Sequence, residues 1–141
     1  MAFSGVKVRG SLEPYTSLEI EHILPATPTA ELRDVWGYEN PKSDYDEFKA
    51  RLGNLTLLEK PINIVAGNDF YAAKQNEYRK SGNYLTRSLV EITEVGQNTS
   101  ISRINEKLDA FPSWGATAID ERQELLIALV EDVWKTTRIA Q

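Results

Sequence analysis

The chain of 141 residues has no cysteine, a single histidine and no long apolar run. Without cysteine there can be no disulfide, zinc ribbon or cysteine nucleophile, and the composition fits a reducing compartment such as the cytoplasm. A structural zinc site would lack its usual ligands, so any metal is expected to be a hard ion held by oxygen atoms, such as Mg²⁺ or Mn²⁺. No segment approaches the ~20 apolar residues of a membrane-spanning helix, and the N-terminus lacks the apolar core of a signal peptide.

The composition is that of an ordinary soluble domain, with 41% hydrophobic and 26% charged residues. The net charge of −5 argues against a general nucleic-acid coat protein. The charge is uneven, however. Residues 49–88 contain seven basic and three acidic side chains, so this stretch carries +4 and the rest of the chain −9. Such a basic face can bind phosphates, although a solvated surface with scattered charge explains the same pattern.

The order of predicted elements indicates an α+β domain that is mostly helical. Residues 18–24 alternate between apolar and polar side chains as a β-strand does, and the pattern stops at Pro25. After a proline-containing loop, a capping pattern from Ser43 predicts a short helix to about Arg51. The β-prone run 54–58 predicts a second strand.

The remainder of the chain is predicted to be helical. A turn over residues 59–63 precedes a helix whose clearest part is 70–80, capped by Asn68 or Asp69. Apolar residues recur with a 3.6-residue period in the last predicted helix, which core packing explains most simply. The further helices are predicted at residues 85–92, at 100–108 and from about 117 to about 139.

His22 follows Glu21 near the end of the first predicted strand. Histidine is the side chain best suited to accept a proton near neutral pH, and an adjacent carboxylate can bind a metal ion. A lone histidine in an apolar strand is more often a packing residue. Asn54 lies at the start of the second strand and Asn63 nine residues later, and this spacing favours a catalytic role for His22. Taken singly, each asparagine is explained equally well as a cap.

Together these segments resemble the HNH nucleases, also called His-Me finger or ββα-metal nucleases, in their His-Asn-Asn form. They resemble more closely the C-terminal nuclease domain of GmrSD-type modification-dependent restriction enzymes. The similarity covers roughly residues 18–136 and implies a two-stranded antiparallel hairpin plus helix, embedded in a helical domain. The residues that carry it are Ile20-Glu21-His22-Ile23-Leu24-Pro25, Leu52-Gly53-Asn54-Leu55-Thr56-Leu57-Leu58, Asn63, Phe70, Lys74, Tyr78, Ser81, Trp114, Ile119, Arg122 and Trp134.

The resemblance implies an HNH-type endonuclease, a phosphodiester hydrolase, in which His22 is the general base. It makes Glu21 and Asn63 the ligands of one Mg²⁺ or Mn²⁺ ion, and Asn54 the residue that braces the loop and orients the base. Lys74 is expected to reach a phosphate or to support the metal shell. Because neighbouring side chains on a regular strand point to opposite faces, Glu21 and His22 can serve one site only if the strand ends or twists there. Many relatives have aspartate in place of Glu21, so ligation through a water is an alternative.

Further side chains are candidate contacts to the backbone of double-stranded DNA. Such contacts position a duplex without reading its sequence, and they predict salt-sensitive binding. For the tyrosine in this set, packing is the favoured role. The set comprises Lys49, Arg51, Lys60, Tyr78, Arg79, Lys80 and Arg87.

We expect a single domain over residues 1–141, with a lead-in at 1–17, the ββα finger at 18–82 and helical support at 83–141. The resemblance also implies phage defence against modified DNA, and an upstream NTPase-like domain or subunit. This chain itself has no Gly-x-x-x-x-Gly-Lys phosphate loop. Nicking is the minimal expectation, since a double-strand break needs a dimer, two binding events or close paired nicks.

Two alternatives to the nuclease remain open. In one, the chain is a non-catalytic DNA-binding or subunit-docking module that keeps the finger as a scaffold. In the other, it is a metal-independent hydrolase built on His22 and a carboxylate.

Overall fold

The computed structural model describes residues 17–91 and 110–139. It is an α+β fold in which a two-stranded antiparallel hairpin is followed by helices, as the sequence predicts. The predicted helix over 100–108 and most of the lead-in lie outside the described residues. In chain order the elements are β1 (Leu18–His22), α2 (Ala30–Glu39), α3 (Tyr45–Lys49), the 3₁₀ turn η1 (Leu52–Asn54), β2 (Leu55–Glu59), α4 (Lys60–Ala66), α5 (Tyr71–Tyr78), α6 (Tyr84–Arg87) and α8 (Ala116–Ile139).

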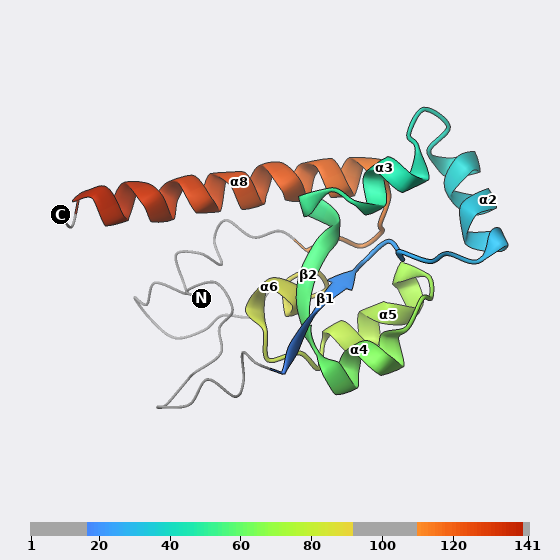
Figure 1. The fold of residues 1–141 in the computed structure, drawn as a ribbon, viewed down its shortest axis with the longest axis horizontal. Coiled ribbons are helices and arrows are strands. Elements are labelled where there is room, and N and C mark those ends of the chain that lie inside the picture. The colour runs from blue at the N-terminus through green and yellow to red at the C-terminus, as the bar shows by residue number, and fades with distance from the viewer. Residues whose placement is uncertain (1–16, 92–109, 140–141) are drawn as a thin grey trace.

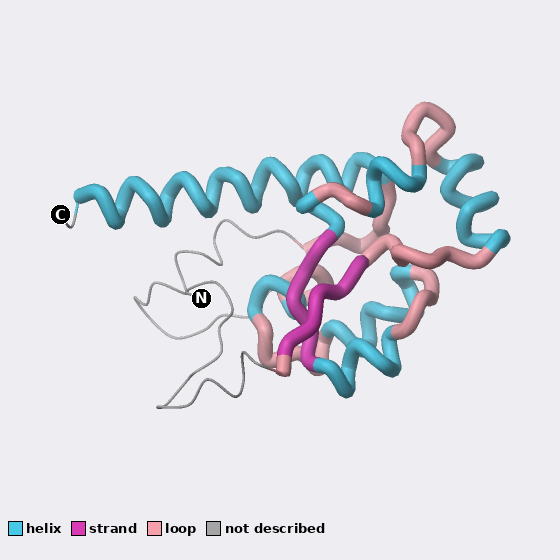
Figure 2. Tube along the Cα trace, in the orientation of Figure 1, coloured by secondary structure: helices cyan, strands magenta, loops and turns pink. Residues whose placement is uncertain are grey.

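The hairpin has one buried face and one partly open face. β1 and β2 pair in regular register, from Leu18 opposite Glu59 to His22 opposite Leu55 (Figure 2). Successive side chains of a strand alternate between its two faces. Glu21 and its neighbour Thr56 on β2 are buried, whereas His22 and Leu55 are half-buried. The buried face therefore carries Glu21, and the open face carries His22.

Helices α4 and α5 and the short α6 lie beside the hairpin, and α4 and α5 contribute to the main core against it (Figure 1). Leu58 of β2 is fully buried in this core. The rest of the core comes from the segment after β1, from these helices and from residues on either side of 92–109. Its buried members are Ile23, Leu58, Ala66, Tyr71, Tyr78, Leu89 and Phe111.

Helix α8 runs over η1 and fixes the start of β2 (Figure 1). A side chain on Gly53 would overlap the carbonyl oxygen of Ile119, so the two backbones approach closely only because residue 53 is glycine. Arg122 of α8 donates hydrogen bonds to the carbonyls of Gly53 at 2.8 Å and Leu55 at 2.7 Å. No helix among the described residues is long and apolar enough to span a membrane.

Helices α2 and α3 form a second small core beyond the end of β1. The Thr29 side chain caps α2 by accepting from the Leu32 N–H, and Asp44 caps α3 in the same way. Trp36 of α2 packs against the rings of α3, with a ring-centroid distance of 5.7 Å to Phe48. Both helices lie in the connection between the two strands.

Three differences from the sequence-based prediction have local causes. β1 ends at His22 rather than residue 24, because the N–H groups of Ile23 and Leu24 bind Asn54 instead of a strand partner. The predicted turn over 59–63 is the first half of α4, where Pro61 is tolerated in the first helical turn. Helix α6 is shorter than predicted, and the N–H groups of Leu89 and Val90 that follow it make i→i+3 hydrogen bonds.

Candidate active site

His22 is the last residue of β1 and lies opposite Leu55 on the open face of the hairpin. Within the described residues, its imidazole makes no hydrogen bond to another group. Desolvation lowers the pKa of His22 below 6.5, nearby Lys74 and Lys49 lower it further, and Glu21 opposes the shift. The imidazole is therefore neutral at pH 7 and has a nitrogen available to accept a proton.

Asn54 holds together both ends of the segment that joins the two strands. Its side chain is fully buried. The amide oxygen accepts from the Leu24 N–H at 2.6 Å, and the amide nitrogen donates to the carbonyls of Leu24 at 2.9 Å and Lys49 at 3.0 Å. The backbone carbonyl of Asn54 accepts from the Ile23 N–H at 3.0 Å. Asn54 thereby fixes the two residues that directly follow His22.

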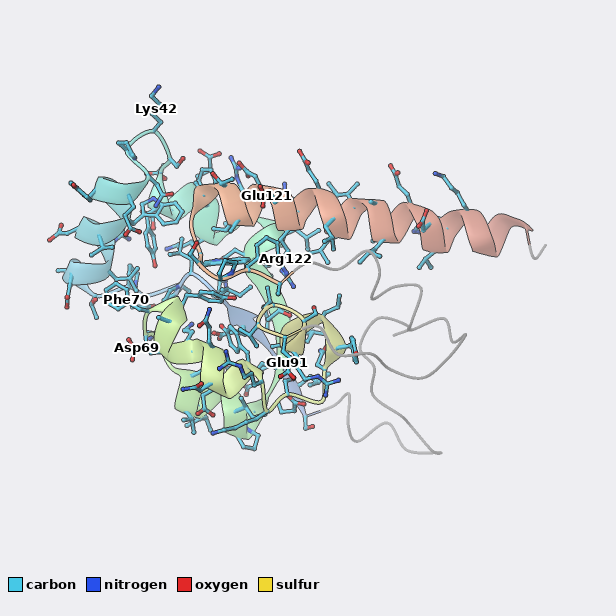
Figure 3. The ribbon with its side chains drawn as sticks, turned by 180° about the vertical axis from the view of Figure 1, so that it is seen from behind. Lys42, Asp69, Phe70, Glu91, Glu121 and Arg122 are labelled. Atoms are coloured by element: carbon cyan, nitrogen blue, oxygen red, sulfur yellow. The ribbon has the colours of Figure 1, made fainter. Side chains whose placement is uncertain are left out.

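Two residues from the C-terminal part of the chain fix Asn54 in turn. The indole N–H of Trp114 donates to the amide oxygen of Asn54 at 3.0 Å, which completes the four hydrogen bonds that an asparagine side chain can make. Arg122 binds the carbonyls on either side of Asn54 and lies between α8 and the hairpin (Figure 3). Burial lowers the pKa of Arg122 to about 10, so it remains charged. Trp114 and Arg122 both belong to the sequence pattern that carries the resemblance, but the pattern does not indicate that they hold Asn54.

Glu21 lies in a buried cluster on the opposite face from His22. Its Oε1 atom accepts from Lys74 Nζ at 2.6 Å and from the Tyr78 hydroxyl at 2.7 Å. Lys74 is 1% exposed and Tyr78 is fully buried. Desolvation lowers the pKa of Lys74, and desolvation also raises the pKa of Tyr78. Tyr78 is therefore a neutral hydroxyl donor at neutral pH.

This burial bears on the roles expected of Lys74 and Tyr78 from the sequence. Lys74 is sealed beneath β1, so its ammonium has no access to a phosphate on a bound duplex. Tyr78 has no exposed surface with which to contact DNA, in keeping with the packing role favoured for it. Both side chains act within the protein, on Glu21.

Asn63, expected from the sequence to be a metal ligand together with Glu21, lies in α4 and contacts another carboxylate, that of Glu19. Its amide nitrogen donates to Glu19 Oε2 at 2.8 Å. Across residues 17–91 and 110–139, no hydrogen bond joins Asn63 to Glu21. β1 is regular through His22, so Glu19 and Glu21 share one face while His22 lies on the other. Glu19 is not among the site residues predicted from the sequence, although its spacing of two residues from Glu21 places it on the same face of a strand.

Glu21 and Asn63 have the oxygen atoms that Mg²⁺ or Mn²⁺ prefers, but their arrangement does not fit a metal held by both. The ammonium of Lys74 already neutralises Glu21, and a divalent cation there would face a buried like charge. In the part of the chain that the structure describes, no group of three or more His, Asp or Glu side chains could hold a metal ion. We therefore assign no metal ligand.

The expected DNA contacts differ in how far acidic neighbours neutralise them. Lys49 binds Asp46 at 2.8 Å, and Lys80 binds Glu77 at 2.8 Å. Arg51 pairs with acidic residues of α3 and α8, and the exposed Arg79 donates to an asparagine side chain. Lys60 is exposed and forms no ion pair among the described residues. Lys60 and Arg79 are thus candidates whose charge is not neutralised by an acidic side chain among the described residues.

Comparison with known proteins gives one finding. The family model described as "GmrSD restriction endonucleases, C-terminal domain" matches residues 6–129. The match includes both strands of the hairpin, the two asparagines and the residues of α8 that contact η1. No curated protein matches the chain, and no solved structure matches it.

Proposed function

Because the chain belongs to the family of GmrSD restriction endonuclease C-terminal domains, we propose that it is a DNA endonuclease with His22 as its general base. The observation that carries the proposal is the state of the only histidine. His22 is half-buried on the open face of the hairpin, its imidazole makes no internal hydrogen bond among the described residues, and its pKa is lowered. These are the properties of a base that remains unprotonated at neutral pH.

In the proposed reaction, the imidazole of His22 accepts a proton from a water molecule beside the scissile phosphate. The oxygen of that water forms a bond to phosphorus as the bond from phosphorus to the leaving oxygen breaks. Asn54 and its partners hold the chain that follows His22, so that the imidazole keeps a fixed position.

The proposal includes dependence on Mg²⁺ or Mn²⁺, which the HNH resemblance implies. When bound, such an ion supplies positive charge to the phosphate oxygens. No residue of this chain is assigned as its ligand, since Glu21 is paired with Lys74 and Asn63 donates to Glu19.

The proposed substrate is double-stranded DNA, modified as in phage-defence systems, and the minimal product is a nick. The family description supports a restriction role. The modification recognised and an NTPase-like partner domain or subunit are parts of the proposal that the resemblance alone supports. Exposed cations such as Lys60 and Arg79 supply contacts to the phosphate backbone, so binding should weaken with salt.

A plasmid assay tests the proposal. Supercoiled plasmid is incubated with the wild type and with His22→Ala, in Mg²⁺, in Mn²⁺ and with a chelator. We expect the wild type alone to produce relaxed circles, and only with metal. An intact plasmid under every condition would favour a non-catalytic DNA-binding or docking module. Nicking that survives chelation would favour a metal-independent hydrolase.

A further inference from the structure

The ammonium of Lys74 binds a side chain and the backbone at the same place. It donates to Glu21 Oε1 at 2.6 Å, to the carbonyl of His22 at 2.9 Å and to the carbonyl of Ile23 at 3.4 Å. A lysine ammonium has three donors, so its capacity is used on these three oxygens. Two of them are the backbone carbonyls of the base residue and of the residue that follows it.

The backbone from His22 to Leu24 is thus held from two sides. Lys74 of α5 binds the carbonyls of His22 and Ile23. Asn54 binds the N–H of Ile23 and both backbone groups of Leu24. These bonds replace the strand pairing that ends at His22, and they fix where the chain leaves the hairpin.

Glu21 keeps the ammonium in this place. The side chains of Lys74 and Glu21 are 1% and 7% exposed, so water screens neither charge. The Tyr78 hydroxyl donates a second hydrogen bond to the same carboxylate oxygen. Removing one member of a buried ion pair leaves an uncompensated charge, whereas replacing both by neutral groups of similar size is often tolerated.

We propose that Glu21 and Lys74 are positioning residues for His22, and that Glu21 is not the ligand of a catalytic metal. The inference rests on the proposed role of His22 as the base. Its support is the occupied state of the carboxylate and the regularity of β1. Glu21 and His22 point to opposite faces of the strand and do not face a common phosphate.

The test compares Glu21→Gln, Lys74→Met and the double variant Glu21→Gln/Lys74→Met with the wild type. Matched controls are Glu121→Gln and Lys42→Met, which remove the same charges from exposed positions; Lys42 lies at the tip of the loop between α2 and α3 (Figure 3). Three quantities are measured: the single-turnover nicking rate, Mn²⁺ binding by electron paramagnetic resonance, and the ring Hε1–Cε1 cross-peak of His22. That cross-peak needs no assignment because the chain has one histidine.

We expect each single variant to shift the His22 cross-peak and to slow nicking by about 10²-fold, the effect of misplacing a catalytic group by about 1 Å. The double variant should unfold less easily than Lys74→Met, because it leaves no unpaired charge, but its nicking rate and cross-peak should stay as in Lys74→Met, because methionine cannot donate to the carbonyls of His22 and Ile23. Mn²⁺ binding should be the same in Glu21→Gln as in the wild type. The two controls should behave as the wild type does.

The inference is overturned if Glu21→Gln loses Mn²⁺ binding while the His22 cross-peak stays at its wild-type position. It is also overturned if folded Lys74→Met keeps the wild-type nicking rate and cross-peak, because the bonds to the carbonyls of His22 and Ile23 are then not what positions the base. Should Lys74→Met fail to fold, Tyr78→Phe removes only one hydrogen bond to Glu21 and should move the cross-peak in the same direction by less. If the wild type does not nick DNA, the proposed function fails, and the cross-peak alone then decides whether Glu21 and Lys74 position His22.

Discussion

Replacing Asn54 with alanine should destabilise the protein far more than the same replacement at Asn63. The Asn54 side chain is fully buried and makes four hydrogen bonds. Asn63 is half-buried, and its side chain donates a hydrogen bond to Glu19. At about 1 kcal/mol for each bond, the expected losses are about 4 kcal/mol for Asn54→Ala and about 1 kcal/mol for Asn63→Ala.

Urea unfolding followed by tryptophan fluorescence measures this difference, because both variants keep all three tryptophans. For a chain of this size a loss of 1 kcal/mol lowers Tm by about 3 °C, so Asn54→Ala should melt about 12 °C and Asn63→Ala about 3 °C below the wild type. Trp114→Phe removes one of the four bonds and should lie near Asn63→Ala. Equal destabilisation by the two alanine variants would refute the bracing role of Asn54.

Three further predictions follow from the same contacts. Because burial holds the pKa of His22 below 6.5 and the neutral imidazole is the base, the acid limb of kcat/KM should be centred below pH 6.5; an acid limb centred above 6.5 contradicts this. Gly53→Ala forces α8 away from η1 and should lower the free energy of unfolding by about 1–3 kcal/mol, whereas Gly37→Ala, which meets no atom within 4 Å, should not destabilise. Lys60→Ala should reduce the slope of log binding constant against log salt by about 0.9 on duplex DNA, as measured by fluorescence anisotropy, and an unchanged slope would exclude Lys60 from the interface.

The elements that were predicted well are those with a local signal. Strand β1 follows from an alternating pattern, β2 from a short β-prone run, and the long α8 from a 3.6-residue pattern. Helix α2 was missed, although Thr29 caps it and Leu32 and Trp36 are its buried residues at a spacing of four. Its remaining positions are mainly exposed or polar, and the two prolines before it favoured a loop. The start of α4 is not predicted because Pro61 is typical of a turn, whereas here it lies in the first turn of the helix.

In the candidate site too, the residues with a local sequence signal could be predicted, and contacts between distant residues could not. His22 and Asn54 were found because each lies in a compact motif with a characteristic neighbourhood. The partners of Glu21 and Asn63 were not found, because contacts such as Glu21 to Lys74 span 53 positions and depend on which face of β1 is buried. Strand alternation already indicated that Glu21 and His22 face opposite ways. The packing of α5 against β1 then decides that Glu21 meets a lysine.

The most direct test of the central claim is the single-turnover rate of plasmid nicking by the wild type, by His22→Ala, and by His22→Ala with added imidazole. A general base contributes about 10²–10⁴-fold to a rate, so His22→Ala should nick at least about 100-fold more slowly than the wild type. Added imidazole should restore part of the lost rate. If His22→Ala is folded and nicks as fast as the wild type, His22 is not the base and the account of this site is wrong.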